Sequence, residues 1–148
     1  MLTERFNLWK PEYSLDIDII DTQHKGFFDI CSESIYLHER AKMDDMQPSD
    51  IIMILYKFRC YAFQHFFTEE SLMIKYHYPS IFAHSSVHDI FLEKLRGFTQ
   101  ELHEISTNKV ATKESLCLIL EHINTYTLSW GSNHVLSQDK QYVQYFKT

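Results

Sequence analysis

A chain of 148 residues has the length of one compact domain, residues 1–148, built around a single core. Its formal net charge of -6 and pI near 5.8 argue against binding to nucleic acid or to an anionic membrane surface, because both repel an acidic protein. The N-terminal stretch lacks the apolar core of a signal peptide, and no uncharged apolar run could cross a bilayer, so we expect a soluble cytoplasmic protein.

The first twenty residues show no helical pattern, and we expect an irregular N-terminal arm in which Trp9 and Pro11 pack against a helix. Behind Asp21-Thr22, apolar and histidine positions recur every three or four residues, which predicts a first helix. Its inner face comprises His24, Phe27, Cys31 and Ile35.

Three further segments have the same helical periodicity. One starts at Pro48-Ser49-Asp50, one follows Pro79-Ser80 and ends near residues 106–108, and the last starts after Thr112, a suitable N-cap. Their inner faces comprise, in chain order, Ile51, Leu55, Phe58, Ala62, His65, Glu69, Leu72 and Tyr76; His84, His88, Phe91, Leu95, Phe98, Leu102 and Ile105; and Leu116, Leu120, Ile123, Thr127, Trp130 and His134. Short connections favour antiparallel neighbours, so the sequence predicts an all-α fold, an up-down-up-down antiparallel four-helix bundle.

Histidine occurs on all four inner faces, and on one of them a carboxylate follows four residues later. Burying such groups without partners costs several kcal/mol each, and several of them would exceed the net stability of a domain. Metal ions bind imidazole and carboxylate groups and so offset the cost of burying both. Because histidine occurs on the inner faces of all four helices, the sequence indicates one metal site that the four helices share. The remaining histidines fall off the inner faces, and we expect surface or capping roles for His38, His77, His103 and His122.

Cys31, Cys60 and Cys117 are odd in number and widely separated. They match neither a disulfide framework nor a Cys-x-x-Cys metal site. Because free cysteine is usually a small core residue, we expect three buried free thiols.

Four segments of the chain resemble the hemerythrin family, specifically its bacterial single-domain members: IDTQH (20–24), HFFTEE (65–70), HSSVH (84–88) and WGSNHVLSQDKQY (130–142). The resemblance implies that His24 and His65 bind one iron ion, that His84, His88 and His134 bind a second, and that Glu69 and Asp139 bridge the two. Asp139 rests on the resemblance alone, because five residues correspond to about 140° around an ideal helix. The helix must therefore loosen or end near Gln138 for this carboxylate to reach the site.

The same resemblance implies a cofactor of two iron ions with a bridging oxygen atom. It also implies that the ion held by two histidines keeps a vacant position, where dioxygen would bind reversibly for storage, delivery or buffering. Reversibility needs a dry pocket, and Phe27, Phe66, Trp130 and Leu136 are candidates for its walls. Gly26 and Gly131 predict looser walls and faster autoxidation than in a typical relative. Glu70 is expected to be solvated or to support a ligand.

The sequence leaves other functions open. The same iron pair could serve a redox enzyme acting on peroxide or nitric oxide, or an oxygen or redox sensor. Without a flavin or nicotinamide fingerprint, the enzyme would need a redox partner to supply electrons. The chain contains no Glu-x-x-His motif, which disfavours a ferritin-like centre, whereas zinc is a rival metal for these ligands. The oligomeric state is left open.

Overall fold

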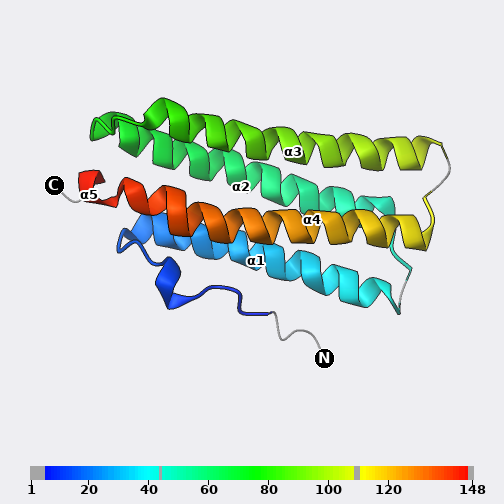
Figure 1. Cartoon of the computed structure of the whole chain (residues 1–148). Helices are drawn as coiled ribbons and strands as arrows, with labels where there is room; N and C mark the ends of the chain where they lie inside the picture. The colour runs from blue at the N-terminus through cyan, green and yellow to red at the C-terminus, as the bar shows by residue number, and fades with distance from the viewer. Residues whose placement is uncertain (1–5, 44, 109–110, 147–148) are drawn as a thin grey trace.

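The structure, a computed structural model, describes residues 6–43, 45–108 and 111–146. Four long helices run antiparallel to their neighbours along the chain, as Figure 1 shows: α1 (Asp18–Ala41), α2 (Pro48–Lys75), α3 (Ile81–Thr107) and α4 (Lys113–Asn133). The chain also forms the short elements η1 (Pro11–Tyr13), η2 (His134–Gln138), η3 (Asp139–Gln141) and α5 (Val143–Phe146). The described residues include no strand, and the predicted all-α four-helix bundle is confirmed.

Two of the helices, α2 and α4, begin where side chains satisfy their first backbone N–H groups. At the start of α2, Gln47 and Asp50 form a capping box, and Pro48 occupies the first turn. The predicted N-cap Thr112 of α4 accepts a hydrogen bond from the backbone N–H of Ser115 and is confirmed. None of the helices in the described part of the chain is both long and apolar enough to cross a membrane.

The first helix begins at Asp18, earlier than predicted. Asp21, expected just outside the helix, instead lies within it and binds the preceding arm. Its carboxylate accepts hydrogen bonds from the backbone N–H of Leu15, at 2.8 Å, and from the hydroxyl of Ser14, at 2.6 Å. The side chain that suggested a helix start therefore fixes the chain segment that leads into the helix.

The N-terminal arm packs against α1 through aromatic rings. Trp9 lies with its ring centroid 6.2 Å from that of Phe28, and the ammonium of Lys25 is 5.3 Å from the Trp9 ring. The prediction that Pro11 also packs against a helix is wrong, because Pro11 is exposed and begins the 3-10 turn η1. That turn directs Tyr13 inward, where its ring stacks on Phe28 at 4.9 Å.

The predicted inner faces form the core of the bundle. Most of their residues are buried, whereas Ile35, Leu72, Tyr76, Ile105 and Trp130 are half-buried. All three cysteines are free, but the expectation of burial holds only for Cys31. Cys60 is exposed and Cys117 is half-buried, because neither follows the inner face of its helix.

Candidate metal centre

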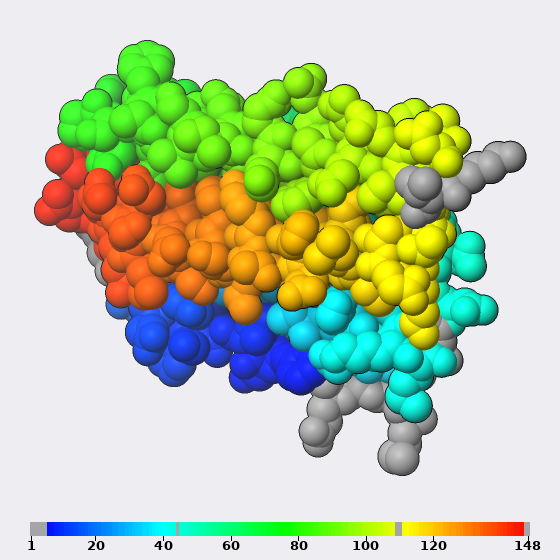
Figure 2. Space-filling view, turned by 45° about the vertical axis from the view of Figure 1, so that its right-hand side comes forward, coloured from blue at the N-terminus to red at the C-terminus, as the bar shows by residue number. Residues whose placement is uncertain are grey.

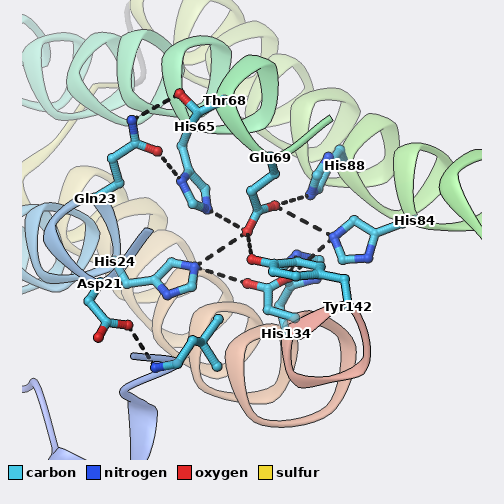
Figure 3. Close-up of polar contacts among 12 residues, drawn as sticks. Asp21, Gln23, His24, His65, Thr68, Glu69, His84, His88, His134 and Tyr142 are labelled. Atoms are coloured by element: carbon cyan, nitrogen blue, oxygen red, sulfur yellow. Dashed lines mark hydrogen bonds and ion pairs between the residues drawn. The ribbon is translucent and has the colours of Figure 1, made fainter. Parts of the chain in front are cut away.

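Seven buried side chains from α1, α2, α3 and the turns η2 and η3 that follow α4 meet at one end of the bundle, as Figure 3 shows for most of them. They divide into two sets, and within each set the candidate ligand atoms lie within 4.8 Å of one another. One set comprises His24, His65, Glu69 and Asp139, and the other comprises Glu69, His84, His88 and His134. The helical spacing that selected these histidines from the sequence thus corresponds to two adjacent groups in space.

Glu69 lies between the two sets, and its two oxygens face opposite ways. Oε1 is 3.1 Å from Nε2 of His65 and 3.6 Å from Nε2 of His24. Oε2 is 2.9 Å from Nε2 of His88 and 3.5 Å from Nε2 of His84. One carboxylate can therefore serve both groups at once.

Asp139 lies between the same groups from the opposite side. Its Oδ2 is 2.9 Å from Nε2 of His24, whereas its Oδ1 is 2.8 Å from Nε2 of His134 and 3.2 Å from Nε2 of His84. The helix does loosen as required, because η2 is a π-helical turn in which the backbone N–H of Asp139 donates to the carbonyl of His134. Residues five apart share one face in such a turn, which brings Asp139 inward.

A short chain of hydrogen bonds orients the ring of His65. The hydroxyl of Thr68 donates to the carbonyl of Gln64, so its oxygen accepts from the amide nitrogen of Gln23 at 3.0 Å. The amide oxygen of Gln23 is then left to accept from Nδ1–H of His65 at 2.6 Å. Nε2 of His65 consequently carries a lone pair that points toward Glu69.

Two further side chains support the second set and the shared carboxylate. Nδ1 of His88 lies 2.9 Å from Oε1 of Glu70, so Glu70 supports a candidate ligand. The hydroxyl of Tyr142, which is fully buried, donates to Oε1 of Glu69 at 2.6 Å. Each of these bonds fixes a ring or carboxylate in the direction of the cluster.

The innermost atoms of the cluster lack hydrogen-bond partners, although their groups lie close together. This holds for Nε2 of all five histidines, for Oε2 of Glu69 and for both oxygens of Asp139. Buried polar atoms that converge without hydrogen-bond partners are costly. Imidazole and carboxylate donors in this arrangement suit a transition-metal cation, and the residues present therefore fit such an ion.

The electrostatics of the metal-free cluster also favour a cation. Burial lowers the pKa of His24 and His84, but the neighbouring carboxylates outweigh it and raise the pKa of each to about 9. Burial would raise the pKa of Glu69, yet the surrounding histidines hold it well below its usual range. Without metal, protons on the histidines neutralise the two carboxylates, so metal binding must displace those protons.

The four residues predicted as pocket walls lie in different positions relative to the cluster. Phe66 stacks on the His88 ring at 3.8 Å, and Trp130 stacks on the His134 ring at 4.4 Å, so both lie beside the three-histidine set. Phe27 is buried behind Trp130, with ring centroids 6.2 Å apart. Leu136 is 39% exposed, which argues against a wall of an enclosed pocket, because the π turn directs the neighbouring Val135 inward instead.

Of the two glycines, Gly131 does not leave the space that was expected near the site. A Cβ atom on Gly131 would lie 2.2 Å from Cε1 of Phe27, so the Phe27 ring already fills that position. Around Gly26 no atom lies within 4 Å of such a Cβ, and this glycine borders open space. The expectation of looser walls at Gly131 is therefore wrong.

One side of the cluster adjoins a surface groove. The groove has a volume of about 760 Å³ and runs between α3 and α4, which lie next to each other on the face shown in Figure 2. Trp130 and His134 contribute to its lining, together with polar residues such as Asn133 and Gln138. The three-histidine set is therefore the part of the cluster closest to this groove.

Three residues beside the cluster were missed in the sequence: Gln23, Tyr142 and Tyr61, whose ring stacks on His65 at 5.2 Å. Tyr142 follows Asp139 by three residues, a helical spacing that could have indicated it. Gln23 carries no comparable signal, because its bond to His65 joins residues of two different helices. The other four histidines, His38, His77, His103 and His122, belong to neither set.

Comparisons with known proteins agree with this geometry. Residues 15–146 match the family model described as the hemerythrin HHE cation binding domain. The chain is 26% identical over 136 residues to a bacteriohemerythrin of Clostridium acetobutylicum. These residues make up 92% of this chain and 98% of the relative. A bacteriohemerythrin of Stenotrophomonas maltophilia is 24% identical over 95% of this chain and 81% of its own length. The match and the histidine and carboxylate cluster together indicate an iron-binding site.

Proposed function

Because this chain belongs to the hemerythrin family, we propose that it binds dioxygen reversibly at a pair of iron ions and thereby stores, delivers or buffers oxygen. The observation that supports this most directly is the position of Glu69, whose two oxygens face two separate groups of histidines. A single-metal site would not need a carboxylate directed both ways. The relatives named bacteriohemerythrin support the same function.

In this proposal Glu69 and Asp139 bridge two iron ions. His24 and His65 complete one ion's protein ligands, and His84, His88 and His134 complete the other's. The first set would offer its ion one protein ligand fewer than the second set, so that ion could accept a small ligand. An iron pair with a bridging oxygen atom would supply dioxygen with two electrons and take them back on release.

The chain's own residues would hold this centre rigid and dry. Gln23 and Glu70 fix the rings of His65 and His88 through their Nδ1 atoms. Tyr142 holds Glu69 through its hydroxyl, at 2.6 Å from Oε1. Tyr61 stacks on the His65 ring, and Phe66 and Trp130 stack on His88 and His134. These rings would limit the access of water to the centre, which would favour release of unchanged oxygen over oxidation of the metal.

One observation favours the alternative of a redox enzyme or a redox sensor. The groove between α3 and α4 reaches Trp130 and His134, so a reductant or a redox partner could approach the centre from that side. Turnover of peroxide or nitric oxide would need such a supply of electrons. Oxygen binding alone would not need it.

The two functions differ in a spectroscopic experiment on iron-loaded, fully reduced protein. We expect a visible charge-transfer band on admitting oxygen, and its loss on purging with argon. A band that persists, or direct conversion to an oxidised form, would support the enzyme or sensor instead.

Iron analysis tests the site itself. About two irons per chain are expected in the wild type and in His103→Ala, a variant of an exposed histidine that belongs to neither set. His88→Ala, on the same helix, should retain less iron, because it removes a ligand of the three-histidine set. Equal iron contents in the two variants would contradict the proposed ligands.

A further inference from the structure

One tryptophan connects the candidate metal centre to the groove between α3 and α4. The ring of Trp130 stacks on the ring of His134, a candidate ligand, with centroids 4.4 Å apart and planes inclined by 12°. Trp130 is half-buried, and together with His134 it lines the groove of about 760 Å³. A single side chain therefore touches both a candidate metal ligand and a space that a small molecule can enter.

Exclusion of water alone does not require an indole at this position. The ring of Phe66 stacks on the ring of His88 at 3.8 Å, so a phenylalanine covers another candidate ligand of the same set. Indole differs from a phenyl ring because it gives up a single electron much more readily. Tyr61 and Tyr142 also carry oxidisable rings beside the cluster, but neither belongs to the groove lining. Trp130 is thus the oxidisable ring between the cluster and the groove.

Toward the core, Trp130 contacts rings that do not exchange electrons. Its ring centroid lies 4.3 Å from that of Phe91, 5.9 Å from that of Phe66 and 6.2 Å from that of Phe27. All three phenylalanines are buried. Because a phenyl ring is far harder to oxidise than indole, these neighbours cannot replace an electron that Trp130 has lost. The replacement must come from the groove.

The groove beside Trp130 has the lining that a flat aromatic molecule with a hydroxyl group needs. Tyr126 and Phe98 offer aromatic rings for stacking, and Asn133 and Gln138 offer amides for hydrogen bonds. A phenol, which is a good donor of single electrons, combines both features.

Charges in the groove disfavour an anionic donor, and they also disfavour Tyr126 as the electron carrier. The lining holds the carboxylates of Glu101 and Glu121 and the ammonium of Lys94, so an anion is repelled more than it is attracted. The ammonium of Lys94 lies 5.4 Å from the centroid of the Tyr126 ring, and a cation over a ring makes removal of an electron from that ring harder. An uncharged phenol beside Trp130 is the arrangement that remains.

We propose that Trp130 carries single electrons from an uncharged phenolic donor in the α3–α4 groove to the metal centre, where they reduce hydrogen peroxide. This inference rests on the iron pair of the proposed function. Hydrogen peroxide takes up two electrons and two protons, its O–O bond breaks, and two water molecules form. Two phenols each give one electron and one proton and leave as phenoxyl radicals. Trp130 loses one electron to the centre in each half of the reaction and regains it from the phenol.

Electron paramagnetic resonance tests the role of Trp130 directly. Hydrogen peroxide is added to the oxidised, iron-loaded full chain without a phenol, and the sample is frozen within milliseconds. We expect an organic radical whose spectrum changes when the protein contains ring-deuterated tryptophan. The chain has two tryptophans, so Trp9→Phe is the matched control and should keep the radical, whereas Trp130→Phe should lose it. Phenylalanine still provides a ring that can stack on His134.

Oxidation of guaiacol, an uncharged phenol, provides the second measurement, made on variants with equal iron contents. The rate should fall at least about tenfold in Trp130→Phe and recover in part in Trp130→Tyr, which restores an oxidisable ring. Trp9→Phe should match the wild type. A radical that persists in Trp130→Phe, equal rates in the wild type and Trp130→Phe, or no radical in the wild type would overturn the proposal. Failure of the wild type to retain iron would instead refute the proposed function, and the peroxide reaction with it.

Discussion

Replacing Gly131 by alanine should destabilise the protein, although this change inside a helix normally stabilises it. The new Cβ would lie 2.2 Å from Cε1 and 2.9 Å from Cδ1 of Phe27, both closer than real contacts allow. The Phe27 ring is buried and packed against the rings of Phe58, Tyr61 and Trp130. It cannot withdraw without moving these neighbours, so the helix or the ring must shift.

The size of the effect follows from two opposing contributions. Overpacking a core costs about 1–3 kcal/mol. Exchanging glycine for alanine within a helix recovers up to about 1 kcal/mol. With the full gain subtracted, the net destabilisation of Gly131→Ala should be up to about 2 kcal/mol, which for a domain of this length lowers Tm by up to roughly 8 °C.

Two other glycines provide matched controls for a thermal unfolding experiment on the iron-loaded protein. Gly26 and Gly97 are also helical, and no atom lies within 4 Å of a Cβ on either. Gly26→Ala and Gly97→Ala should therefore stabilise by about 0.5–1 kcal/mol. In Phe27→Leu the cost of Gly131→Ala should shrink, because the two residues are in contact. Equal stabilisation by all three alanine variants would refute the close packing of Phe27 on Gly131.

Three shorter predictions concern the surroundings of the cluster. Tyr142→Phe removes the hydrogen bond to Glu69 and leaves a buried acceptor without this donor, so it should lower the free energy of unfolding by about 1–3 kcal/mol. An unchanged midpoint of urea unfolding would contradict that bond. Gln23→Leu removes the acceptor of the His65 ring and should weaken iron binding about 10–100-fold in a chelator competition, with an unchanged affinity as the contrary result. Burial raises the pKa of the Cys31 thiol to about 12, so at pH 8 iodoacetamide should label Cys31 only after unfolding, and mass spectrometry would detect native labelling that refutes this.

The sequence by itself predicted the four helices because their inner positions repeat with the helical period. It also predicted five histidines on those faces, which the structure places in two adjacent groups. Neither result needed knowledge of the packing, since a buried face and its polar interruptions are visible in one dimension. The N-cap of α4 was equally local, because Thr112 and Ser115 are three residues apart.

Other features were decided only by tertiary structure, because they depend on contacts between segments distant in the chain. Periodicity alone would not have selected Asp139, which reaches the cluster through the π turn at residues 134–138. Gln23 meets His65 across two helices, and Phe27 occupies the space beside Gly131, which the sequence had suggested was open. Helical period determines which side chains face inward, but the packing of those helices determines which atoms meet.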